Sequence, residues 1–76
     1  MPNAEAAKVI GSQDIETQKA LAKEFFESTI LKNFSSETVR SAYEVYAQLK
    51  GTEFSNTFRE LESNRLVEAG YSPLTL

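Results

Sequence analysis

The chain has 76 residues, of which 41% are apolar, a net charge of −3, and neither cysteine nor histidine. This length allows one domain over residues 1–76 whose core contributes only about 3–5 kcal/mol. Disulfides and the usual zinc ligand pairs are excluded, so we expect no metal and no cofactor. Stability must therefore come from helix packing alone or from a partner.

The first expected element is a short helix over residues 3–10. Asn3 can cap its start, and Gly11 can end it in the left-handed conformation. A helix of about two turns is marginal on its own. A frayed segment over residues 1–11 is therefore the alternative.

The second expected helix covers residues 13–33. Ser12 is the expected N-cap, and Asp14 and Glu16 suit the positive end of the helix dipole. Leu31 falls on the polar side, where it stays exposed unless something covers it. The opposite face is apolar and takes about half of the cylinder, with Ile15, Leu21, Ala22, Phe25, Phe26 and Ile30.

The third expected helix covers residues 36–50. Ser35 is its expected N-cap, and Phe34 can pack on Val39 as a hydrophobic staple. Its apolar face is about 200° wide, which predicts a central helix that contacts neighbours on two sides. This face contains Val39, Ala42, Tyr43, Val45, Tyr46, Ala47 and Leu49.

The fourth expected helix covers residues 53–69. Gly51 ends the preceding helix, Thr52 caps the new one, and a narrow apolar stripe follows with Phe54, Phe58 and Leu61. Arg65 stands where the helical period predicts an apolar residue. Either its stem packs on the core with its head in water, or its guanidinium pairs with a carboxylate across an interface.

The end of the fourth helix is well marked. Gly70 suits the left-handed position after a helix, and Tyr71 can then pack on Leu66 in a Schellman ending. Pro73 prevents further helix. The tail over residues 71–76 carries two leucines and a tyrosine that no expected helix accommodates. Val67 also lies off the apolar stripe.

These elements predict an all-α fold, a small three-helix bundle with helices near 13–33, 36–50 and 53–69 and a short N-terminal helix as an option. No segment alternates with period two, and no hairpin signal of the Asn-Gly or Asp-Gly type is present. The β alternative is therefore weak.

The sequence offers no catalytic pattern. The serines lack a histidine base, and the glycines at 11, 51 and 70 are too isolated for a phosphate loop. Glu60 and Glu62 point apart on a helix and do not converge. We expect no enzyme activity, no membrane span, no secretory signal and a cytoplasmic location.

The expected function is therefore non-covalent binding of another protein or of a second copy of this chain. A small acidic chain of this kind fits an adaptor, a regulator or an inhibitor, and its size is typical of bacterial or phage proteins. A small structural subunit of a larger assembly is an alternative from the same pattern. The candidate partner-binding residues are Leu31, Tyr43, Tyr46, Arg65, Tyr71, Leu74 and Leu76.

A further alternative comes from residues 43–62, which resemble a helix-turn-helix when Gly51 occupies the turn and Ala47 the small position before it. The run 58–67 is also similar to the recognition-helix endings of winged regulators. The resemblance implies DNA binding with helix 53–69 in the major groove. Several positions depart from the motif's apolar pattern, and Glu53 and the net negative charge disfavour phosphate, so we expect nucleic acid binding to be absent. The departing residues are Lys50, Thr52, Thr57 and Glu60.

Overall fold

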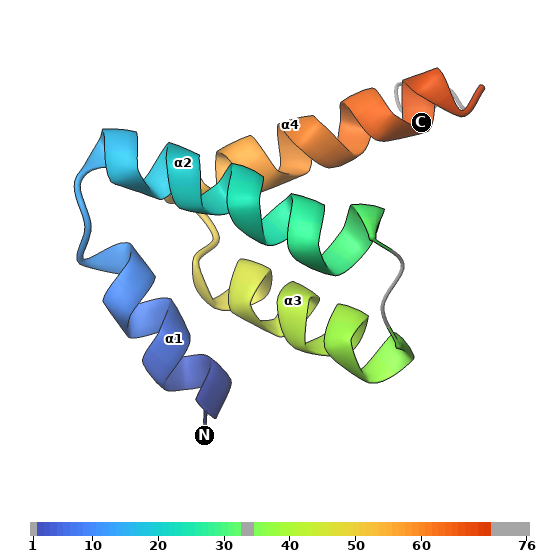
Figure 1. Cartoon of the computed structure of the whole chain (residues 1–76). Coiled ribbons are helices and arrows are strands. Elements are labelled where there is room, and N and C mark those ends of the chain that lie inside the picture. The colour runs from blue at the N-terminus through green and yellow to red at the C-terminus, as the bar shows by residue number, and fades with distance from the viewer. Residues whose placement is uncertain (1, 33–34, 71–76) are drawn as a thin grey trace.

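The structure is a computed structural model that describes residues 2–32 and 35–70. These residues form helices only, which confirms the all-α class. The elements are α1 (Pro2–Gly11), α2 (Ile15–Phe26), the π-helical segment η1 (Glu27–Leu31), α3 (Ser36–Gln48) and α4 (Glu53–Glu68). Figure 1 shows α2 and α4 side by side, with α3 below α2 and α1 next to α3.

Phe58 of α4 lies at the centre of the core and is fully buried. Its ring is close to five other aromatic rings, which come from α2, α3 and α4 itself. Aromatic pairs at such separations are attractive beyond the apolar area that they bury. The centroid distances are 6.3 Å to Phe25, 5.3 Å to Phe26, 5.9 Å to Tyr43, 5.4 Å to Tyr46 and 6.3 Å to Phe54.

The N-terminal helix α1 is longer than expected and belongs to the core. Ala7 is buried, and the Asn3 side chain donates a hydrogen bond to Glu44 of α3 at 2.5 Å. Since α1 already begins at Pro2, the prediction that Asn3 caps the helix is wrong. The prediction that Gly11 is left-handed is also wrong, since its φ is not positive. A Cβ at this position would lie 3.1 Å from Leu49 Cδ2, so close packing against Leu49 is what favours glycine here.

The start of α2 differs from the expected start at residue 13. Asp14 is the N-cap, and its carboxylate accepts a hydrogen bond from the Thr17 amide at 2.8 Å. The prediction of Ser12 as the cap is wrong, because its hydroxyl instead donates to the Val9 carbonyl. A carboxylate in the cap position also interacts with the helix dipole, which a hydroxyl does much less. Ile15, expected on the apolar face, is 59% exposed at this first turn.

The last part of the expected helix, from Glu27 to Leu31, is not α-helical. It continues as η1, a π-helix, in which the hydrogen bonds span five residues. The Thr29 hydroxyl donates to the Phe25 carbonyl at 2.6 Å and so competes for an acceptor of the helix main chain. A π-helix has a wider turn, so each residue advances by less than 100°. This rotation brings Leu31 from the expected polar side towards Phe26.

The two later helices begin as predicted. Ser35 caps α3 by accepting from the Thr38 amide at 3.3 Å, and Thr52 caps α4 by accepting from the Ser55 amide at 3.4 Å. Both helices end one or two residues before the predicted ends, which is within the usual variation of helix boundaries. The predicted staple of Phe34 lies outside the described residues.

The apolar face of α3 is narrower than expected. Ala42, Val45 and Leu49 are buried, whereas Tyr43 and Ala47 are exposed. The helix contacts α1, η1 and α4, as expected for a central element. However, α2 also contacts α1, η1 and α4, and the most extensive pairing is α2 with α4. The central position is therefore shared by α2 and α3.

A buried glutamine, Gln18 of α2, joins three parts of the chain. Its Oε1 accepts from the Phe54 amide at 3.2 Å, and its Nε2 donates to the carbonyls of Gln13 at 2.9 Å and Gly11 at 3.3 Å. The Phe54 amide belongs to the first turn of α4, where main-chain donors have no partner within the helix. Gln18 therefore connects the turn after α1 to the start of α4.

Replacement of the central ring should unfold the chain. We expect Phe58→Ala to cost about 3–5 kcal/mol, because the variant loses buried area and leaves a cavity among the remaining rings. That is comparable to the whole stability expected for a domain of this size. Val67→Ala, at a 57% exposed position of the same helix, should change stability by less than about 0.5 kcal/mol. Urea titration followed by circular dichroism measures both, and equal midpoints would contradict the assigned core.

Replacement of Gln18 by Leu should destabilise the chain by about 1–3 kcal/mol, since the Phe54 amide then stays buried without an acceptor. Gln48→Leu is the matched control at an exposed position, and we expect little change there. Urea midpoints compare the two variants, and hydrogen exchange of the Phe54 amide gives an independent reading. A Gln18→Leu variant as stable as the parent would show that this network does not join the helices.

Candidate protein-binding groove

The second half of α4 extends beyond the other helices, as Figure 1 shows. Residues 64–70 are all exposed, and they include Leu66 and Val67. The core-facing stripe of α4 consists of Phe54, Phe58 and Leu61, of which the first two are fully buried and the third is half-buried. The last residues of α4 therefore have no neighbouring described helix to pack against.

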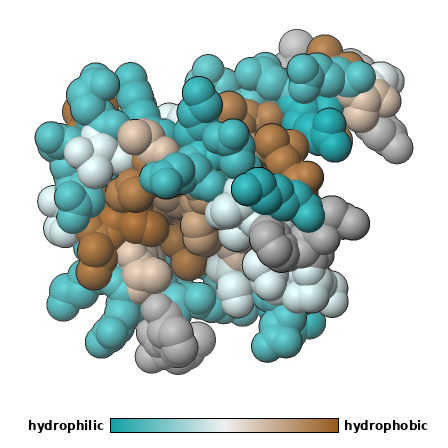
Figure 2. All heavy atoms as spheres, viewed as in Figure 1, coloured by the Kyte–Doolittle hydropathy of each residue, from teal (hydrophilic) through white to brown (hydrophobic). Residues whose placement is uncertain are grey.

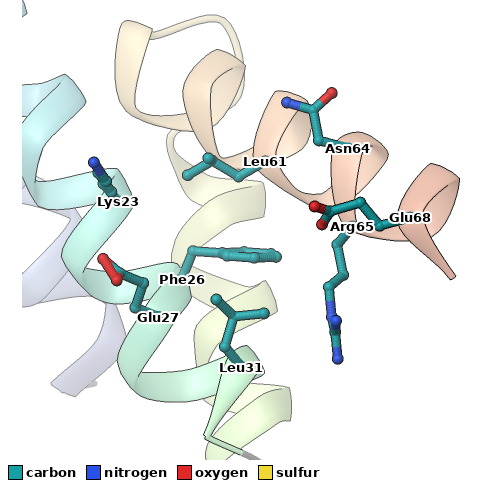
Figure 3. Close-up of a pocket in the computed structure, with 8 residues that line it drawn as sticks. All are labelled: Lys23, Phe26, Glu27, Leu31, Leu61, Asn64, Arg65 and Glu68. Atoms are coloured by element: carbon teal, nitrogen blue, oxygen red, sulfur yellow. The ribbon is translucent and has the colours of Figure 1, made fainter.

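An open groove of about 300 Å³ lies between this half of α4 and the end of α2 with η1. Figure 3 shows Phe26, Leu31 and Leu61 pointing towards one another, and these three side chains form an apolar floor. The floor has a charged rim with two side chains of each sign. The rim residues are Lys23, Glu27, Arg65 and Glu68, and Asn64 completes the lining.

The surface view agrees with this description. Figure 2 shows apolar atoms between the projecting end of α4 and the body of the molecule, next to hydrophilic side chains. Leu31 is 42% exposed, which is high for a large aliphatic side chain beside buried Phe26. An apolar floor that faces solvent and has a polar rim is the usual form of a protein-binding surface.

The structure brings together two of the predicted partner-binding residues, Leu31 and Arg65. Leu31 reaches the groove because η1 rotates it, and Arg65 reaches it because the core stripe of α4 continues past the body. In Figure 3, Arg65 extends from α4 at the open side of the groove. Its stem borders the apolar floor, while its guanidinium remains accessible to a carboxylate of another molecule.

The predicted tyrosines lie elsewhere, between α3 and α4. The Tyr43 hydroxyl donates a hydrogen bond to the carboxylate of Glu62, and its ring meets that of Phe58 edge to face at 5.9 Å. Tyr46 is half-buried against the same ring. Because Leu61 and Glu62 are consecutive, they point about 100° apart, and Tyr43 contacts a different side of α4 from the groove. Both tyrosines help to hold α3 against α4.

The environment of Tyr43 favours its neutral form. Partial burial, followed by the hydrogen bond to Glu62 and the negative charge of that carboxylate, raises the pKa of Tyr43 from 10.0 to about 12. The neutral hydroxyl is the form that can donate this hydrogen bond. The role of Tyr43 in the α3–α4 contact therefore depends on its protonation.

The remaining predicted residues, Tyr71, Leu74 and Leu76, lie outside the described residues, as does the expected contact of Tyr71 with Leu66. Their assignment to a partner stays a prediction.

Sequence reasoning missed several residues of the groove, namely Lys23, Phe26, Glu27, Leu61, Asn64 and Glu68. Phe26 and Leu61 were expected only in the core. The available signal was the length of α4, whose stripe continues after its last buried position. How far α4 passes the end of α2 depends on tertiary packing, which periodicity does not encode.

The polar face of α4 is the surface that would contact DNA if the helix-turn-helix resemblance were functional. Gly51 has a φ of 93°, so the glycine placed at the turn of the resemblance is in the left-handed region. However, Glu53 and Glu60 line the outer depression of α4 together with a single basic residue, Arg59. Acidic side chains on the face that would enter the major groove repel phosphate. The turn glycine therefore fits the resemblance, whereas the charge of this face disfavours DNA binding.

Residues 2–32 and 35–70 hold no group of three or more acidic, histidine or cysteine side chains placed to bind a metal ion. None of the helices described is both long enough and apolar enough to cross a bilayer.

Comparison with family models, curated proteins and solved structures gives no match.

The raised pKa of Tyr43 predicts a loss of stability at high pH. Below pH 10 the tyrosine is neutral in both states. Between pH 10 and about 12 the unfolded chain loses this proton while the folded chain retains it, so stability falls as pH rises. We expect Tyr43→Phe to remove this part of the pH dependence. Urea midpoints across this range measure it, and identical pH profiles for the variant and the parent would contradict the assigned environment.

Proposed function

We propose that this chain is a non-catalytic protein-binding module, an adaptor or a regulatory or inhibitory protein, that binds another protein or a second copy of itself through the α2–α4 groove. The observation that supports this most directly is the open apolar floor beneath the projecting end of α4, where Leu31, 42% exposed, and half-buried Leu61 face solvent beside buried Phe26. A floor of this kind gains free energy when a partner removes it from water, at about 25 cal/mol for each Å² of apolar surface.

The composition of the groove suits a protein partner. The strongest contributions to protein interfaces come from apolar and aromatic side chains in a central pocket and from arginine. The groove has an apolar centre with Arg65 at its edge, and the guanidinium can form a bidentate pair with a carboxylate. A structural subunit of an assembly would use the same surface, so this alternative differs in its partner and not in its site.

The groove can be tested with two matched variants. Leu31 and Val9 are both exposed aliphatic residues near the C-terminal ends of their helices, and an Asp at either position meets the same unfavourable helix dipole. Leu31→Asp should weaken binding about tenfold or more, which corresponds to about 1.4 kcal/mol. Val9→Asp, on α1, should bind like the parent.

The measurement has two parts. Sedimentation at micromolar concentration tests self-association, and quantitative capture from the native host tests for another protein. In the part that detects binding, we expect loss for Leu31→Asp and retention for Val9→Asp. Equal binding by the two variants would contradict the proposed site, and absence of binding in both parts would contradict the proposed function.

A further inference from the structure

The floor of the groove contains a pair of residues that an α-helix does not place side by side. Phe26 and Leu31 both line the groove, and they are five residues apart in the chain. At 100° per residue, residues five apart point about 140° away from each other on an α-helix. In a π-helix the hydrogen bonds span five residues, so such residues lie about one turn apart on the same side. The groove floor therefore depends on the π-helical form of η1.

Two side-chain hydroxyls meet at the point where α2 changes into η1. Thr29 Oγ1 donates to the Phe25 carbonyl at 2.6 Å, and Ser28 Oγ donates to the same carbonyl at 3.2 Å. A carbonyl oxygen has two lone pairs, so these two donors occupy both. In a continuous α-helix this carbonyl accepts from the amide of Thr29 instead. The hydroxyls therefore weaken the α-helical hydrogen bond of Phe25 just before η1 begins.

We propose that Thr29 is a positioning residue of the groove, whose hydroxyl holds η1 in the π-helical form and so keeps Leu31 beside Phe26. Thr29 is only 8% exposed, so water has little access to its hydrogen bond, whereas Ser28 is exposed and its hydrogen bond is longer. This inference rests on the proposed function only for the effect on binding, since the placement of Leu31 is a property of the free chain.

The α-helical alternative keeps the core and loses only the groove floor. Ile30 packs against the core and lies about 40° from Phe26 on an α-helix, so it stays on the core side in that form. Leu31 instead points about 140° from Phe26, on the solvent side with exposed Glu24. The two forms therefore differ mainly in whether Leu31 reaches the groove.

The test compares two substitutions at position 29. Thr29→Val keeps the branched shape and removes the hydroxyl, whereas Thr29→Ser keeps the hydroxyl and removes the methyl group. NMR spectra of the free chain should show contacts from the Leu31 methyl groups to the Phe26 ring in the parent and in Thr29→Ser. We expect Thr29→Val to lose these contacts. Thr57→Val, the same change at a half-buried position outside the groove lining, should keep them.

A purely structural role of Thr29 gives a different result. Loss of packing or of one hydrogen bond lowers the urea midpoint of Thr29→Val and leaves the contact of Leu31 with Phe26 in place. That outcome would overturn the inference, as would loss of the contact in Thr29→Ser as well as in Thr29→Val. Absence of the contact in the parent chain would also overturn it, and this measurement does not depend on the folding of any variant.

Binding separates this inference from the proposed function. In the part of the binding measurement that detects association, Thr29→Val should bind several-fold more weakly than the parent, and Thr29→Ser should bind like the parent. Unchanged binding by a Thr29→Val chain that has lost the contact would overturn the positioning role, while Leu31→Asp still tests the groove. If neither part detects association, the proposed function fails and the NMR contacts decide this inference on their own.

Discussion

The packing of five aromatic rings around Phe58 is the interaction on which the rest of this structure depends. The ring of Phe58 meets Phe26 of α2 at 5.3 Å and Tyr46 of α3 at 5.4 Å, so a single side chain of α4 joins the two other long helices. A chain of 76 residues without disulfides has few alternatives to such a concentrated core. The hydrogen bonds of Gln18 and Ser55 add direction, because they attach the start of α4 to α2 and to the Tyr46 carbonyl.

The position of this core within α4 also explains the groove. Phe54 and Phe58 lie in the first half of the helix, and the neighbours that cover them end near Leu31. The second half of α4 therefore projects, and Leu61 borders an open apolar floor that no described helix covers. The same arrangement that stabilises the fold thus leaves an apolar surface uncovered by the described helices.

The sequence predicted the helices better than it predicted their environment. The caps Ser35 and Thr52 were correct because cap residues act locally, through a side chain and an amide three residues away. The start of α2 was wrong because Ser12 and Asp14 are both good caps, and only the packing of the preceding turn selects between them. The groove could be predicted only in part. Leu31 and Arg65 stood out as residues off the expected pattern, but their proximity depends on η1 and on the projection of α4, which are tertiary effects.

The most direct test of this account is the set of proton contacts of the Phe58 ring in solution, measured by NMR with selectively labelled Phe and Tyr. The account predicts cross-peaks from Phe58 to Phe26 on α2 and to Tyr43 and Tyr46 on α3. Cross-peaks to Phe54 of the same helix alone, with none to α2 or α3, would contradict it, because α4 would then not be the element that holds the bundle together.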